Sequence, residues 1–160
     1  MRRGTALGLC IQAVLFVLFG CEGSKPGVPR RAELKILGPT TVEIIPQPGQ
    51  YPNCLLYTVS EKGVNRQLTM TLEDESVPCE AGTPIGGVPY KVPKSEGKVR
   101  IYVIFSDRPL KGSSVAQQLN EMANSGKPLT AMDLRAPGNA AIETLEFLPQ
   151  IPQAAQSAAP

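Results

Sequence analysis

The chain has 160 residues, and its 16 Lys and Arg against 14 Asp and Glu give a formal net charge of +2. It contains neither His nor Trp. Without His there is no Ser/His or Cys/His nucleophile pair and no common zinc-ligand set, which excludes much of ordinary hydrolase chemistry.

The N-terminal segment, residues 1–21, is typical of a secretory signal rather than of a folded element. Arg2 and Arg3 provide a positive start, residues 4–20 carry no charge, and residues 13–19 form an apolar run. The segment closes on Cys21, and the composition turns polar directly after it.

The end of this segment, Leu18-Phe19-Gly20-Cys21, resembles the lipobox of bacterial lipoproteins, with Leu at −3, a small residue at −1 and Cys as the first mature residue. It departs from that pattern at −2, where Phe19 replaces a small or aliphatic residue. The resemblance implies a signal peptide over residues 1–20 and a lipid anchor on Cys21. Several acyl chains on one Cys hold a protein firmly in a membrane, whereas a single chain binds marginally.

Two other interpretations of this segment stay open. The first is an uncleaved membrane anchor, although residues 4–20 are at the lower limit of length for a span. The second is an ordinary signal peptide that leaves Cys21 free. All three interpretations place residues 22–160 outside the cytoplasm. Glu22 resembles neither the Asp that retains enteric lipoproteins in the inner membrane nor the neutral residues that release them, and of the two membranes we expect the outer one.

Cleavage would change the charge balance of the chain. Loss of Arg2 and Arg3 lowers the Lys and Arg count from 16 to 14, equal to the 14 acidic residues. A mature protein with a formal charge near zero and no basic stripe is not expected to bind nucleic acid.

Cysteine usage agrees with an oxidising compartment. Cys10 lies in the signal and Cys21 would carry the lipid, so Cys54 and Cys79 remain as an even pair. We expect a disulfide between them. A redox-active pair is the alternative, but the spacing is not that of a CxxC motif.

Residues 22–31 are rich in Pro and Gly and predict a mobile spacer, so that residues 21–31 form a lipidated Cys and flexible tether. Residues 32–148 are expected to form one domain, and residues 149–160 a disordered tail of mostly Gln, Ala and Pro.

Within the domain, short β-branched or alternating segments predict strands over 32–37, 41–45, 54–60, 66–73, 98–105 and 142–148. Gly38-Pro39 predicts a turn between the first two, which we expect to form a hairpin. Residues 66–73 place Leu68, Met70 and Leu72 on one face and form the clearest hairpin with 54–60. Residues 98–105 are apolar on both faces, which indicates a central strand. Residues 142–148 also suit a helical period, but we favour a strand.

The segment 74–97 is a long Pro-rich loop with a brief strand expected at 88–92. Its Tyr90 either contacts a partner or folds back onto the sandwich.

One helix is predicted over residues 115–125, with Ser114 as N-cap and Gln117 completing a capping box. Its apolar stripe is Val115, Leu119 and Met122, and we expect its polar residues to face water, namely Gln117, Gln118, Asn120, Glu121 and Asn124. Residues 129–134 are expected to hold a further turn of helix.

Acidic residues gather at Glu73-Asp74-Glu75, with Glu80 nearby. They lack the spacing of a calcium loop or of paired glycosidase acids, so we interpret them as a solvated strand end. No phosphate-binding or nucleophile-elbow motif occurs. We therefore predict no catalytic residue, no metal site and no cofactor.

Residues 97–110, which read GKVRIYVIFSDRPL and are followed by a polar helix, resemble the closing strand, turn and helix of a bacterial β-sandwich family. That family occurs in envelope and membrane-anchored proteins of δ-proteobacteria, has no established activity, and carries over no functional residue. The resemblance implies a mainly β, sandwich-like domain with one short helix appended.

These observations predict a membrane-anchored extracytoplasmic lipoprotein that is a non-enzymatic binding or assembly module of the bacterial cell envelope, with an envelope protein as its partner. The alternative is a periplasmic lipoprotein that binds a small ligand or glycan, with the 74–97 loop as one wall of the site.

Overall fold

The structure is a computed structural model that describes residues 29–125 and 129–150. The predicted signal peptide, Cys21, most of the tether and residues 151–160 of the predicted tail lie outside the described residues. Within the described part of the chain, no helix is long and apolar enough to cross a membrane.

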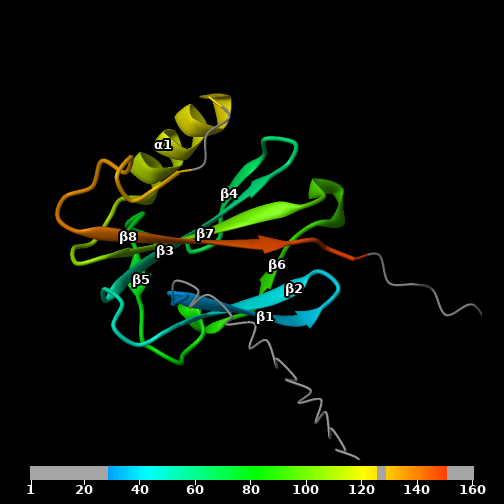
Figure 1. Ribbon diagram of the computed structural model, residues 1–160, viewed down its shortest axis with the longest axis horizontal. Coiled ribbons are helices and arrows are strands. Elements are labelled where there is room, and N and C mark those ends of the chain that lie inside the picture. The colour runs from blue at the N-terminus through cyan, green and yellow to red at the C-terminus, as the bar shows by residue number, and fades with distance from the viewer. Residues whose placement is uncertain (1–28, 126–128, 151–160) are drawn as a thin grey trace, which may run out of the picture.

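The prediction of a mainly β sandwich-like domain with one short helix is confirmed. Two antiparallel sheets pack face to face, and the helix covers the outer face of the larger sheet (Figure 1). The strands are β1 (Ala32–Gly38), β2 (Thr41–Pro46), β3 (Asn53–Ser60), β4 (Asn65–Gln67), β5 (Val77–Pro78), β6 (Tyr90–Lys91), β7 (Val99–Ser106) and β8 (Ala140–Phe147). The helix is α1 (Gly112–Ser125), and two short 3-10 turns are Ile85–Gly87 and Lys94–Glu96.

The smaller sheet has the order β1-β2-β6, and the larger has the order β4-β3-β7-β8, with β5 also paired to β3. The predicted hairpin of β1 and β2 is confirmed. Strand β7 is central as predicted, because it pairs along its whole length with β3 on one side and β8 on the other.

Alternate side chains of β7 point to opposite faces of the sheet and so enter two different apolar cores. Val99, Ile101, Val103 and Phe105 lie in the core between the two sheets. Tyr102 and Ile104 belong to a second core beneath α1, which also contains Val115 and Leu119 from the predicted helix stripe. Two buried faces explain why residues 98–105 are apolar almost throughout.

The predicted strand over residues 66–73 is wrong beyond Gln67. Leu68 N–H still donates to Leu56 O, at 2.8 Å, but the next β3 donor, Leu56 N–H, bonds the buried Thr69 hydroxyl at 3.0 Å. The chain then leaves the sheet, and Met70 and Leu72 lie in water instead of on a buried face.

The predicted N-cap of the helix is also wrong, because α1 begins at Gly112 and includes Ser114. The side chain of Gln118, expected to face water, is buried and bonds the backbone of Arg135 at 3.2 and 2.7 Å. These two bonds attach the segment after the helix to α1. Residues 131–133 form a single hydrogen-bonded turn and not a turn of helix.

The 74–97 segment is more ordered than a long loop. It contributes β5 and β6, and β6 confirms the brief strand expected there. Tyr90 is buried and its hydroxyl donates to Ile85 O at 2.7 Å, so it folds back onto the sandwich. Burial raises the Tyr90 pKa to about 12.

At both ends, ordered contacts extend slightly beyond the predicted domain boundaries of residues 32 and 148. Arg31, placed in the tether, donates its backbone N–H to Glu143 Oε2 at 2.9 Å. Gln150, placed in the tail, donates its N–H to Pro39 O at 2.8 Å, and Pro149 is buried.

Candidate functional site

The most exposed large apolar side chains of the domain include two neighbours on one loop. Met70 is 81% exposed and Leu72 is 101% exposed. Both belong to residues 68–75, which connect β4 to β5 and which we name the contact loop. An isolated exposed apolar residue is ordinary in a soluble domain, so the significance of this pair depends on how the loop holds it.

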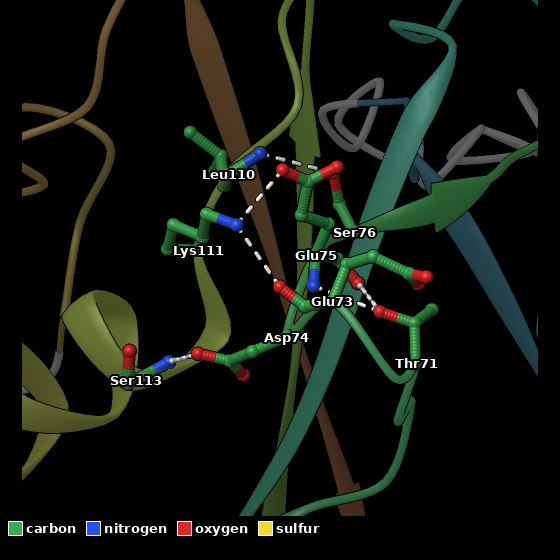
Figure 2. Close-up of polar contacts among 8 residues, drawn as sticks. All are labelled: Thr71, Glu73, Asp74, Glu75, Ser76, Leu110, Lys111 and Ser113. Atoms are coloured by element: carbon green, nitrogen blue, oxygen red, sulfur yellow. Dashed lines mark hydrogen bonds and ion pairs between the residues drawn. The ribbon is translucent and has the colours of Figure 1, made fainter.

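The contact loop is closed by a hydrogen-bonded turn, shown in Figure 2. Asp74 N–H donates to Thr71 O at 3.2 Å, and Leu72 and Glu73 are the two residues between them in this turn. The Thr71 hydroxyl accepts from Glu75 N–H at 2.8 Å and donates to Glu75 O at 3.1 Å. A Thr side chain that bonds the backbone in this way imitates a backbone turn and restricts the loop.

Asp74 joins the contact loop to the start of α1 (Figure 2). Its Oδ2 accepts from Ser113 N–H at 2.9 Å, and its carbonyl accepts from Gly112 N–H at 2.8 Å. A carboxylate at a helix N-terminus satisfies donors that have no partner within the helix and is favoured by the helix dipole. Asp74 thus caps α1, although it lies far from this helix in the sequence.

The electrostatic environment agrees with this role. The hydrogen bonds from the Ser113 side chain and backbone hold the pKa of Asp74 below its usual value, with a smaller contribution from the charge of Lys111. Asp74 also has φ +54°, a left-handed conformation that Asp adopts more readily than most residues.

Lys111 and Leu110 hold the other side of the loop. Lys111 Nζ lies 2.9 Å from Glu73 O and 2.9 Å from Glu75 Oε1. Leu110 N–H donates to Ser76 Oγ at 3.0 Å, and Ser76 N–H donates to Leu110 O at 2.9 Å. The contact loop is therefore tied to the 110–113 segment at several points.

The acidic residues singled out from the sequence have separate roles. Asp74 caps α1, Glu75 pairs with Lys111, and Glu73 and Glu80 are exposed. Among the described residues, no group of three His, Cys, Asp or Glu side chains could hold a metal ion.

Cys54 and Cys79 lie at disulfide distance, with Cα atoms 5.6 Å apart. Cys54 is fully buried in the core between the sheets, and Cys79 packs against that core. The pair connects β3 to the chain directly after β5. Cys21, the predicted lipidation site, lies outside the described residues.

A cavity of about 380 Å³ opens under the second half of α1, over the end of the larger sheet. A second hollow of about 280 Å³ lies beside β8 and is lined by Arg30, Leu34 and residues 143–146. Neither is lined by the 74–97 segment, which the sequence suggested as a wall of a ligand site.

Comparisons with known proteins leave the family undetermined: the sequence matches no protein-family model, and no curated protein or solved structure is significantly similar to it. The lipobox and the likeness of residues 97–125 to an envelope β-sandwich family accordingly stay predictions.

Sequence reasoning missed the contact loop because Leu68, Met70 and Leu72 alternate as a buried strand would. The one available signal was Glu73-Asp74-Glu75, three consecutive acids that end the alternation. The cavity gave no local signal, because its lining comes from β3, β7, β8 and α1 together.

Proposed function

We propose that this protein is a lipid-anchored, non-enzymatic binding module of the bacterial cell envelope, and that its contact loop docks a partner protein. The observation that carries the proposal is the exposure of Met70 and Leu72, at 81% and 101%, on a loop held by hydrogen bonds.

The preorganisation of the loop supports a docking role. Ordering a loop on binding costs free energy, and a loop already held in one conformation avoids most of that cost. Met70 adds an unbranched, polarizable side chain that adapts to irregular apolar surfaces. Burying both side chains against a partner would contribute on the order of 3–5 kcal/mol before the costs of association.

The charges beside the apolar pair indicate the kind of partner. Glu73, Asp74 and Glu75 are acidic, and of these three carboxylates Lys111 forms an ion pair only with that of Glu75, while it bonds the backbone carbonyl of Glu73. This acidic margin suits a protein surface with an apolar pocket and basic residues at its rim. It disfavours an anionic lipid surface, which attracts basic segments.

The anchor is supported by residues 1–21. A lipid on Cys21 with a short Pro- and Gly-rich tether would hold the domain close to the membrane, where a membrane-associated partner is at high effective concentration. Weak contact through a small patch then suffices for stable assembly.

Site-specific photocrosslinking in intact cells tests the proposal. A benzoylphenylalanine replacing Leu72 should crosslink to one protein, at a pocket with basic residues on its rim. The same group at Val88, which is 53% exposed elsewhere on the domain, serves as the matched control. The double variant Met70→Ser/Leu72→Ser should lose co-purification of that partner, while Ile36→Ser/Val88→Ser retains it.

Crosslinking of position 72 to lipid, or to no protein, would overturn the docking assignment. Cys21→Ser provides the control for anchoring, since it should release the chain from the membrane. A wild-type chain whose mature Cys21 carries no lipid by mass measurement would contradict the anchored part of the proposal.

A further inference from the structure

The cavity under α1 lies at one end of the helix-facing surface of the larger sheet. The register of the strands places Val59, Arg100 and Glu146 side by side across β3, β7 and β8. Tyr102, Leu119 and Leu129 provide apolar walls, and Ala123 of α1 also lines the space. Its volume of about 380 Å³ is within the range of small-molecule sites.

Four charged residues line the cavity, namely Glu61, Lys98, Arg100 and Glu146, and only two of them form an ion pair. Lys98 Nζ and Glu146 Oε2 form an ion pair at 2.5 Å. A hydrogen bond from Lys98 and its charge, with a smaller effect of Arg100, lower the pKa of Glu146, so this carboxylate is ionised at neutral pH. Lys98 and Glu146 therefore largely neutralise one another.

The other two charged residues, Arg100 and Glu61, form no ion pair within residues 29–125 and 129–150. Both residues line the cavity and are exposed, and Arg100 lies beside Glu146 in the sheet, where its charge also lowers the pKa of that carboxyl group. Glu61 follows β3 and its side chain lies over Gly97, whereas Arg100 projects from β7. The cavity thus offers a cation and an anion beside an apolar wall.

We propose that this cavity binds a free α-amino acid with an apolar side chain. The ligand carboxylate would bond the Arg100 guanidinium, its ammonium group would bond Glu61, and its side chain would lie in the cavity against the apolar lining residues. A guanidinium recognises a carboxylate through two parallel hydrogen bonds, which gives geometric selectivity as well as affinity. This site is separate from the contact loop and does not depend on the docking function.

Isothermal titration calorimetry with three matched probes tests the assignment, using the full chain in lipid nanodiscs and empty discs as the blank. L-phenylalanine carries both charged groups, 3-phenylpropanoate lacks the ammonium, and phenethylamine lacks the carboxylate. We expect phenylalanine to bind about tenfold more tightly than either analogue, because each loses one charged hydrogen bond.

Variants then assign each group. Arg100→Gln should weaken phenylalanine about tenfold and leave phenethylamine unchanged. Glu61→Gln should weaken phenylalanine and leave 3-phenylpropanoate unchanged. Arg108→Gln, an exposed Arg beyond the other end of β7, should change nothing. Ala123→Phe should abolish binding by filling the cavity, with its fold checked by circular dichroism.

No heat of binding for phenylalanine would overturn the proposal, as would equal affinities for the three probes. Equal binding by wild type and Arg100→Gln would also overturn it. Met70→Ser/Leu72→Ser should bind phenylalanine normally, which separates this result from that of the docking experiment.

Discussion

At the residue scale, Asp74 shows how one side chain joins two parts of the domain. Its carboxylate caps α1 through Ser113, and its backbone closes the turn with Thr71. Ser114, which has the sequence features of a cap, is inside the helix. A cap supplied from a distant loop cannot be found from the residues next to the helix, because local motifs describe only local hydrogen bonds.

Replacing Asp74 with Asn removes the charge while keeping an acceptor and a residue that tolerates positive φ. The lowered pKa means that Asp74 contributes stability above its unfolded pKa, about 3.9, and loses it as the pH falls through the folded pKa. Asp74→Asn should thus be less stable than wild type at pH 7, and the difference should shrink below about pH 4.

Urea unfolding of both proteins from pH 7 to pH 3 measures this convergence. Glu80→Gln is the matched control, because Glu80 is exposed and does not cap a helix. A constant difference between Asp74→Asn and wild type across that range would show that the charge of Asp74 does not stabilise the fold.

At the element scale, the short β4 illustrates where alternation fails as a guide. Residues 66–73 have the period of a strand, yet pairing with β3 ends after Val59↔Asn65, Thr58↔Arg66 and Tyr57↔Gln67. Thr69 then supplies its hydroxyl to Leu56 N–H in place of a backbone carbonyl. The alternation is real, but the apolar residues that follow are displayed to solvent instead of being buried.

Thr69→Val tests how much the hydrogen bond from Leu56 N–H to the Thr69 hydroxyl contributes to stability. The variant keeps the shape of a side chain that is 3% exposed but leaves the buried Leu56 N–H without its acceptor. We expect a loss of about 1–3 kcal/mol in the free energy of unfolding. Thr144→Val, at an exposed position of β8, should be close to neutral in the same denaturation experiment.

At the scale of the whole molecule, Cys54 and Cys79 connect the core to the segment that continues into β6. Their sequence separation is 25 residues. Closing a loop of this length should stabilise the fold by about 3–4 kcal/mol on the chain-entropy model. The bond would hold the chain that follows β5 against β3, the strand with which β5 pairs in the larger sheet.

Unfolding of the wild-type chain with and without a reductant measures this contribution directly. Reduction should lower stability and add two hydrogens to the mass, and Cys54→Ala/Cys79→Ala should show no response to reductant. Equal stability of oxidised and reduced wild type would mean that the pair adds nothing to the fold.

The sequence by itself determined the sheet class, the first hairpin, the central position of β7 and the proximity of the two domain cysteines. Each depends on a strong local pattern: β-branched runs, a Gly-Pro turn, two apolar faces, or an even Cys count. These patterns predict the fold correctly because they agree with the burial of apolar side chains when the strands pack.

Tertiary structure alone decided the cap of α1, the exposure of Met70 and Leu72, and the cavity with Arg100 and Glu61. Each of these brings together residues from separate elements, such as Asp74 with Ser113 or Val59 with Glu146 across the sheet. Contacts of that kind form only once the two sheets and the helix pack, so a local pattern carries no information about them.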